Sequence, residues 1–320
     1  MERTTIIWLI VAACLVMLGA SLFTVVMALN HWDFNQLGTT TYETNTHHIS
    51  EDFRDIHIIS DTADILLVPA MDGSCTVDCF EAVNEKHSVE VIDGILTIRV
   101  QNNKKWYEYI GINFGSPKLT LCLPQRQYGA LTVEEHTGDV EIPKELTFEA
   151  MDITVSTGKI NSMASVFGPV KLRSSTGNIG LEGISAESLE LSVSTGRITV
   201  SHVTCPGDIQ LRSSTGKTDL KSVSCKSLST KGTTGDITLS SVIAAEIISI
   251  ERDTGDVTFE GSDAAEIFVK TSTGRVKGTL LSDKIFITQT GTGSVNVPHT
   301  TTGGQCRITT GTGNINIRIP

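Results

Sequence analysis

A Thr-Gly pair recurs every 19 or 20 residues from Thr137 onward, and this period constrains the fold more than any other feature of the chain. A period fixed to within one residue is typical of a solenoid, in which each repeat is one structural unit, or rung, stacked on its neighbours. The ten glycines of these pairs are Gly138, Gly158, Gly177, Gly196, Gly216, Gly235, Gly255, Gly274, Gly293 and Gly313.

Apolar residues on both sides of each pair alternate with polar ones. Two residues after the glycine, nine of the ten positions are β-branched aliphatic, the exception being Thr218. The alternation continues two residues further on, apart from Ser162 and Gly278, and a second apolar run precedes each pair, as at Ile153 and Leu172. A period of two predicts strands and excludes helical repeats. Leucine-rich repeats of similar period carry an Asn or Cys ladder and spaced leucines, which this chain lacks.

We therefore predict an all-β fold, a single-stranded parallel β-solenoid with rungs of 19–20 residues. The glycines are expected in tight turns with positive φ, and the threonines are expected to stack between rungs. Residues 131–320 would form ten regular rungs, a rod of about 45–50 Å. Residues 51–130 carry less regular strands and are expected to form the first rungs and a cap, with Asp61 to Ile65 as a degenerate copy of the turn.

The first thirty residues predict a membrane span. Residues 6–29 are uncharged and almost wholly apolar, and 24 residues of helix cover about 36 Å. We assign residues 1–5 to a short cytoplasmic tail, 6–29 to a transmembrane helix that acts as a signal-anchor, and 30–50 to a polar linker. A signal peptide cleaved near Ala28 and a lipoprotein signal at Cys14 are alternatives, but the apolar run is long for either.

The orientation of the span follows from a few charges. Arg3 precedes it, and no Lys or Arg follows until Arg54. The positive-inside bias then places the C-terminal domain outside the cytoplasm of a single-pass cell-membrane protein.

The chain also resembles a known family, the bacterial putative-adhesin domain of unknown function, a toastrack-like β-solenoid on an N-terminal membrane anchor. The resemblance covers about residues 53–320 and rests on the irregular opening strands, on Leu119 to Pro124, and on runs such as Val193 to Ile198 and Gly232 to Ile237. It implies the fold and an envelope location. The family supplies no catalytic motif.

Charge and motifs limit the classes of function that we expect. The net charge of −11, from 25 basic and 36 acidic residues, argues against a nucleic-acid partner. The eight histidines show no ligand spacing with cysteines, so we expect isolated surface or linker histidines, no metal site, no cofactor and no enzyme activity. Asp236 and Asp256 directly follow their glycines on adjacent rungs, so their side chains could form a pair of catalytic carboxylates, as in a carbohydrate-active β-helix. Lys217 and Arg275 flank them, which favours a solvated charge ladder.

Two further groups are candidate sites. Trp106, Tyr107 and Tyr109 form an aromatic cluster, either a platform that contacts a ligand or part of a cap over the end of the solenoid. Cys205 and Cys225 each lie nine residues after their glycines, so adjacent rungs bring them within disulfide range in an oxidising compartment. Buried free thiols are the alternative.

The main functional hypothesis is a non-enzymatic surface binding or scaffold module with a protein or cell-wall glycan partner. The alternative is an envelope-stress sensor or regulator acting through a membrane partner, and a polysaccharide-active enzyme is a distant third. The last strand carries Ile315, Ile317 and Ile319 and stops at Pro320. Such an edge would be unpaired, so we expect a second copy, as a homo-dimer through the C-terminal rung, or a partner strand to cover it.

Overall fold

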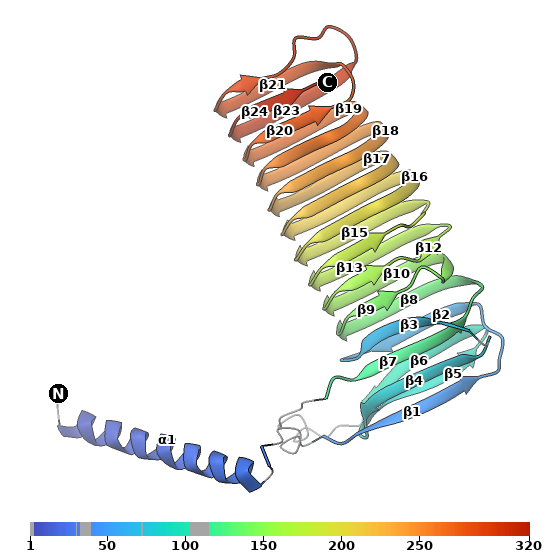
Figure 1. The fold of residues 1–320 in the computed structure, drawn as a ribbon, viewed down its shortest axis with the longest axis vertical. Coiled ribbons are helices and arrows are strands. Elements are labelled where there is room, and N and C mark those ends of the chain that lie inside the picture. Colours follow the sequence, from blue (N-terminus) through green and yellow to red (C-terminus); the bar gives the residue numbers. More distant parts are fainter. Residues whose placement is uncertain (1–2, 30, 33–39, 72, 103–114) are drawn as a thin grey trace.

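The structure is a computed structural model that describes residues 3–29, 31–32, 40–71, 73–102 and 115–320. An apolar helix, α1 (Arg3–Leu29), precedes a long stack of strands (Figure 1). Most strands pair in parallel with strands of the neighbouring rungs, so the predicted parallel β-solenoid is confirmed. Within the described residues, α1 is long and apolar enough to cross a membrane, and a signal sequence near the N-terminus has the same properties.

The N-terminal part of the stack contains one rung and an antiparallel cap. Its strands are β1 (Tyr42–Ile49), β2 (Asp55–Ser60), β3 (Asp64–Ala70), β4 (Cys75–Ala82), β5 (Glu85–Ile92), β6 (Ile95–Asn102) and β7 (Lys118–Pro124). Strands β2 and β3 run parallel to the two strands of the next rung. Ala63, in the turn between them, lies against Gly138, so residues 61–65 are indeed a copy of the Thr-Gly turn.

The cap closes this end by antiparallel pairing. Strand β4 lies between β1 and β7, and β5 and β6 form a hairpin whose turn residues, Asp93 and Gly94, both have positive φ. Strand β6 then continues the sheet beside β2, and β7 does so beside β3.

Residues 42–49, which the sequence analysis assigns to a polar linker, form β1 and pair with β4 along their whole length. The polar composition misled the prediction because an outer antiparallel strand needs only one buried face.

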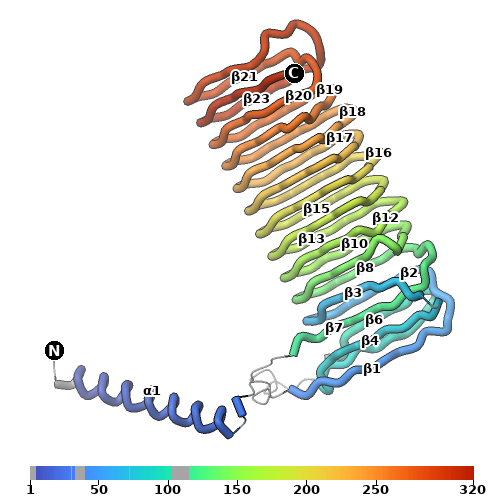
Figure 2. Tube along the Cα trace, in the orientation of Figure 1, coloured from blue at the N-terminus to red at the C-terminus, as the bar shows by residue number. Residues whose placement is uncertain are grey.

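The regular rungs follow. Their strands are β8 (Gln127–Thr137), β9 (Val140–Ile142), β10 (Thr147–Thr157), β11 (Ile160–Ser162), β12 (Ser165–Val166), β13 (Pro169–Thr176), β14 (Ile179–Glu182), β15 (Ser188–Thr195), β16 (Ile198–Thr215), β17 (Thr218–Thr234), β18 (Ile237–Thr254), β19 (Val257–Thr273), β20 (Val276–Leu280), β21 (Lys284–Thr292), β22 (Val295–Asn296), β23 (Gly304–Thr312) and β24 (Ile315–Arg318). Equivalent inward residues pair across rungs, as Leu172 does with Ile153 and Leu191, and form one continuous aliphatic core. Figure 2 shows the same path of the chain as a tube.

The turn glycines permit close approach as well as an unusual φ. A Cβ atom on Gly196 would lie 1.8 Å from the carbonyl oxygen of Gly177 in the rung below, and the φ of Gly196 is 149°. Gly138 and Gly274 lack a positive φ in the left-handed region, but a Cβ atom there would meet the neighbouring turn at 2.2 and 1.9 Å. The turn positions therefore require glycine for two reasons: most of them have a positive φ, and the space between rungs also excludes a side chain.

A second turn, at equivalent positions of successive rungs, is not marked by a recurring residue in the sequence. Residues with φ between 53° and 65° recur in five successive rungs: Gly183, His202, Ser222, Ser241 and Gly261. Three of the five are not glycine, so the stacked strands on either side impose a conformation that L-residues rarely adopt.

Thr218 departs from the aliphatic pattern because it binds a buried arginine. Arg252 is 1% exposed, lies in the same inward row as Gly232 and Ser213, and donates hydrogen bonds to the Ser213 carbonyl oxygen (2.7 Å) and to Thr218 Oγ1 (2.9 Å). Gly232 leaves the room for the guanidinium group, since a Cβ atom there would lie 1.8 Å from Arg252 Nη1. Burial lowers the pKa of Arg252.

The C-terminal end corrects the prediction of an exposed last rung. Strand β23 lies between β19 and β21, and β24 lies between β20 and β22. The last rung along the chain, β23 with β24, thus lies between the rung of β19 and β20 and the rung of β21 and β22. Strands β21 and β22 therefore form the end of the stack. The expected homo-dimer through the C-terminal rung therefore loses its basis, because Ile315 and Ile317 are buried and both edges of β24 are paired within the chain. Equal spacing along the sequence cannot reveal this exchange of order.

We expect Gly196→Ala to reduce the unfolding free energy by at least about 2 kcal/mol, because the methyl group meets a carbonyl oxygen that the strand pairing holds in place. Gly183→Ala is the matched control, since Gly183 has a φ of 65° and open space where a Cβ atom would lie. Denaturant unfolding of the full chain, followed by circular dichroism, compares the two. Equal losses would show that backbone conformation alone requires glycine at the Thr-Gly turn.

Candidate functional sites

A shallow groove of about 400 Å³ crosses five rungs near the cap. One row of outward positions forms part of its lining, and these residues are register partners in successive rungs: Leu66, Glu141, Asn161, Gly180 and Thr199. Gly180 carries no side chain, which deepens the row at its centre.

The walls of the groove combine apolar and polar groups. Pro143 and Met163 lie at its border, and Met163 is 44% exposed. The carboxylate groups of Glu141 and Glu182, the amide of Asn161 and the hydroxyl of Thr199 supply hydrogen-bonding groups. Apolar walls with a few polar groups are typical of a surface that binds a ligand.

The residue after each turn glycine forms a ladder of contacts between rungs. Where that residue is Asp or Asn, its side-chain oxygen accepts a hydrogen bond from the backbone N–H of its equivalent in the adjacent rung. Asp139 accepts from Lys159 (2.7 Å) and Asn178 accepts from Arg197 (2.9 Å). Lysine or arginine lies next to an acidic residue at several steps of the ladder, so the ladder also contains ion pairs.

Asp236 and Asp256 belong to this ladder, as the sequence analysis favoured. Asp236 accepts a hydrogen bond from the backbone of Asp256 (3.0 Å) and lies 3.8 Å from Lys217. Asp256 accepts hydrogen bonds from the backbone and the guanidinium group of Arg275. Partial burial works to raise the pKa of Asp256, but the contacts with Arg275 together hold it below its ordinary value. These contacts favour a structural role over paired catalytic carboxylates.

The other predicted site residues divide into two groups. Cys205 and Cys225 are register partners on β16 and β17, so the two residues lie side by side on adjacent rungs as expected. Both thiols are buried and free. Trp106, Tyr107 and Tyr109 lie outside the described residues.

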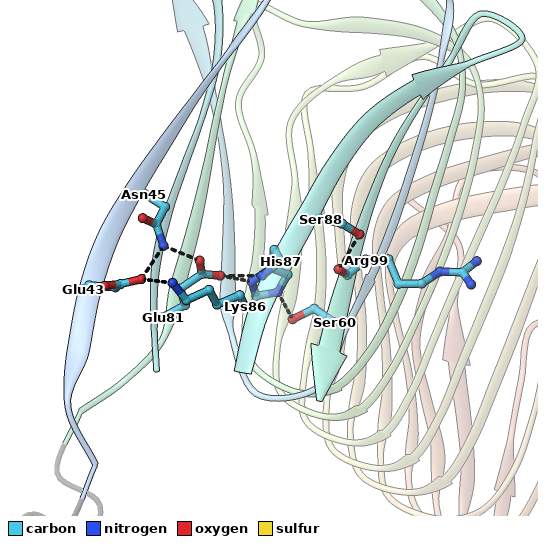
Figure 3. A network of polar contacts seen from close by, with 8 residues as sticks. All are labelled: Glu43, Asn45, Ser60, Glu81, Lys86, His87, Ser88 and Arg99. Atoms are coloured by element: carbon cyan, nitrogen blue, oxygen red, sulfur yellow. Dashed lines mark hydrogen bonds and ion pairs between the residues drawn. The ribbon is translucent and has the colours of Figure 1, made fainter. Parts of the chain in front are cut away.

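A network of buried polar side chains, which the sequence pattern did not predict, lies inside the cap (Figure 3). Glu81 accepts hydrogen bonds from the backbone N–H of His87 (2.6 Å) and from Asn45 (2.8 Å), and its Oε2 lies 2.7 Å from His87 Nδ1. On the other side of the ring, His87 Nε2 lies 3.3 Å from Ser60 Oγ. Glu81, His87 and Ser60 are all buried, contrary to the expectation of isolated surface histidines.

The strands of the cap explain this convergence. Cys79 and Glu81 alternate inward on β4, the chain reverses, and His87 points inward from β5. Ser60 ends β2 and pairs with Glu135 of β8. The alternation of Val77, Cys79 and Glu81 was a usable signal, because it places a carboxylate on the buried face of the strand.

Burial changes the acidity of two groups in and beside the network. It raises the pKa of Cys79 to about 12, and the charge of Glu81 adds to this effect. It also raises the pKa of Glu135 to about 7, although hydrogen bonds from Ser60 and from the backbone of Thr137 oppose the rise.

The stacked parallel rungs with a Thr-Gly turn define a β-solenoid of the toastrack type. The family model described as Toastrack DUF4097 matches residues 53–216 and 203–320, and the chain belongs to this family. No curated protein matches the chain.

Several solved structures are similar to the chain. A putative adhesin from Parabacteroides distasonis is 16% identical, with a TM-score of 0.50 over 87% of this chain and 98% of that one. A putative lipid binding protein from the same organism is 17% identical, with a TM-score of 0.47 over 75% of this chain and 95% of that one. A putative adhesin from Bacteroides fragilis is 17% identical, with a TM-score of 0.41 over 88% and 97% of the two chains.

We expect the unfolding free energy to fall as the pH rises from about 4.5 to 7, because the folded protein keeps the Glu135 proton over a range in which the unfolded chain has lost it. The shift corresponds to roughly 3 kcal/mol, and Glu135→Gln should remove this part of the pH dependence. Urea unfolding of the full chain at pH 5 and pH 8 measures it. Glu134→Gln, at the neighbouring exposed position, should behave as the wild type, and an unchanged pH dependence in Glu135→Gln would contradict the assignment.

Proposed function

We propose that the chain is a non-enzymatic, membrane-anchored binding module of the bacterial envelope that holds a cell-wall glycan in the groove beside the cap. The observation that carries this proposal is the groove itself, because the stacked strands fix the relative positions of its lining residues before any ligand arrives. A preformed surface binds with little loss of conformational entropy.

The chemistry of the groove suits a sugar chain. Glycans present apolar C–H faces beside hydroxyl groups, and here Pro143 and Met163 line the same groove as the side chains of Asn161 and Thr199. The row of lining residues spans five rungs, so an extended ligand would meet equivalent positions about every 4.8 Å. The names of the solved relatives, putative adhesins among them, agree with a surface binding role.

The helix and the order of the chain support the proposed membrane location. Helix α1 ends at Leu29 and β1 begins at Tyr42, so the cap is the end of the solenoid nearest to the anchor in sequence. The end rung, β21 with β22, lies at the opposite end of the stack (Figure 1). On this proposal, the groove belongs to the part of the rod closer to the bilayer.

The proposed topology predicts that a reporter fused after Pro320 lies outside the cytoplasm. A tandem fusion of alkaline phosphatase and green fluorescent protein should show phosphatase activity without fluorescence. The same fusion lacking residues 3–29 should show fluorescence without phosphatase activity, since it has lost the apolar helix. Fluorescence from the fusion that keeps the helix would overturn the topology.

Binding is tested by cosedimentation of the detergent-solubilised full chain with purified peptidoglycan sacculi. We expect Gly180→Leu to weaken binding at least fivefold, because the new side chain fills the centre of the groove. Thr238→Leu is the matched control, since Thr238 occupies the same outward column three rungs further along the stack. Failure of the wild type to sediment with sacculi, or equal binding by Gly180→Leu, would overturn the proposal.

A further inference from the structure

Three chemically different metal ligands meet inside the cap. Cys79, Glu81 and His87 each offer one ligand atom, and the three atoms lie within 4.8 Å of one another. All three side chains are buried, with exposed fractions of 0%, 1% and 8%. Among the residues that the structure describes, no other group of three His, Cys, Asp or Glu side chains meets this condition.

We propose that Cys79, Glu81 and His87 bind a divalent transition-metal ion of the zinc class. Thiolate sulfur, imidazole nitrogen and carboxylate oxygen are the donors that zinc takes in proteins, at bond lengths of about 2.0–2.3 Å. Ligands bound tetrahedrally at these lengths lie about 3–4 Å apart, so small side-chain movements bring the three atoms to their places around one ion. The metal site is separate from the groove and does not depend on the proposed glycan binding.

The surrounding contacts orient two of the ligands as an outer shell does in metal sites. Asn45 donates to Glu81 Oε1 (2.8 Å), which leaves Oε2 directed at the histidine ring. Ser60 Oγ, at 3.3 Å from His87 Nε2, can accept a hydrogen bond from the N–H of that nitrogen when Nδ1 binds the metal. Outer-shell partners of this kind fix the tautomer and the orientation of a ligating histidine.

Metal binding releases one proton, that of the Cys79 thiol. The Cys79 thiol releases its proton to solvent and binds as thiolate. His87 binds through Nδ1 in the tautomer that carries its proton on Nε2, and the contact between His87 Nδ1 and Glu81 Oε2 is replaced by two bonds to the metal. The ion would join β4 to β5 and fix the turn between these two strands, since metal binding contributes directly to folding stability.

The test uses Co²⁺ as a spectroscopic probe of the full chain in detergent, after treatment with a chelator. We expect a thiolate-to-cobalt charge-transfer band that saturates at one ion per chain and disappears when Zn²⁺ is added. Cys79→Ser should abolish the band, and Cys205→Ser, which changes another buried thiol, should keep it. His87→Gln should weaken Co²⁺ binding at least tenfold, and circular dichroism checks the fold of each variant.

A second measurement keeps the proposal falsifiable if the Cys79 variant fails to fold. Zn²⁺ should raise the melting temperature of the wild type and of Cys205→Ser, because it binds only the folded state. Ser60→Ala should show a smaller rise, because it leaves the three ligands in place and removes only the outer-shell contact. The absence of a charge-transfer band in folded wild-type protein, or a band that persists in Cys79→Ser, would overturn the site. Loss of glycan binding alone would leave it standing.

Discussion

The approach of one Thr-Gly turn to the next is the contact on which the rest of the structure depends. The carbonyl oxygen of each turn glycine lies where a side chain of the next glycine would begin, so the turns stack in one register only. Once the turns are aligned, backbone hydrogen bonds such as Gly196 N–H to the Thr215 carbonyl follow at each rung. The aliphatic rows inside the solenoid and the Asp and Asn ladder outside it align by the same register.

A core fixed in this way accommodates polar groups that an irregular core would expel. Arg252 remains inside because Gly232 leaves room for it and Thr218 accepts one of its hydrogen bonds. The cap has a similar arrangement, in which Glu81 receives three close polar contacts from His87 and Asn45. Buried charges without such partners would destabilise the fold by several kcal/mol. In both places the polar residues are therefore part of the packing.

The sequence predicted the solenoid well because its two signals, a fixed period and alternation of apolar residues, are local. It predicted the turn glycines and the register of Cys205 with Cys225 for the same reason. The corners at His202, Ser222 and Ser241 were not predictable, since their positive φ comes from stacking and not from residue type. Strand β1 was missed because a polar edge strand resembles a linker, and the convergence of Glu81 with His87 was missed because it depends on how the cap folds back.

The insertion of β23 and β24 between β19–β20 and β21–β22 affects the order in which the solenoid can assemble. In a stack built strictly along the chain, each rung adds to a finished edge as soon as it is synthesised. Here β21 cannot take its native neighbours until the residues after it have arrived, because it has no direct pairing with β19. The far end of the rod therefore closes only with the last strands of the chain, and the growing polypeptide would carry an open sheet edge at β19 until that moment.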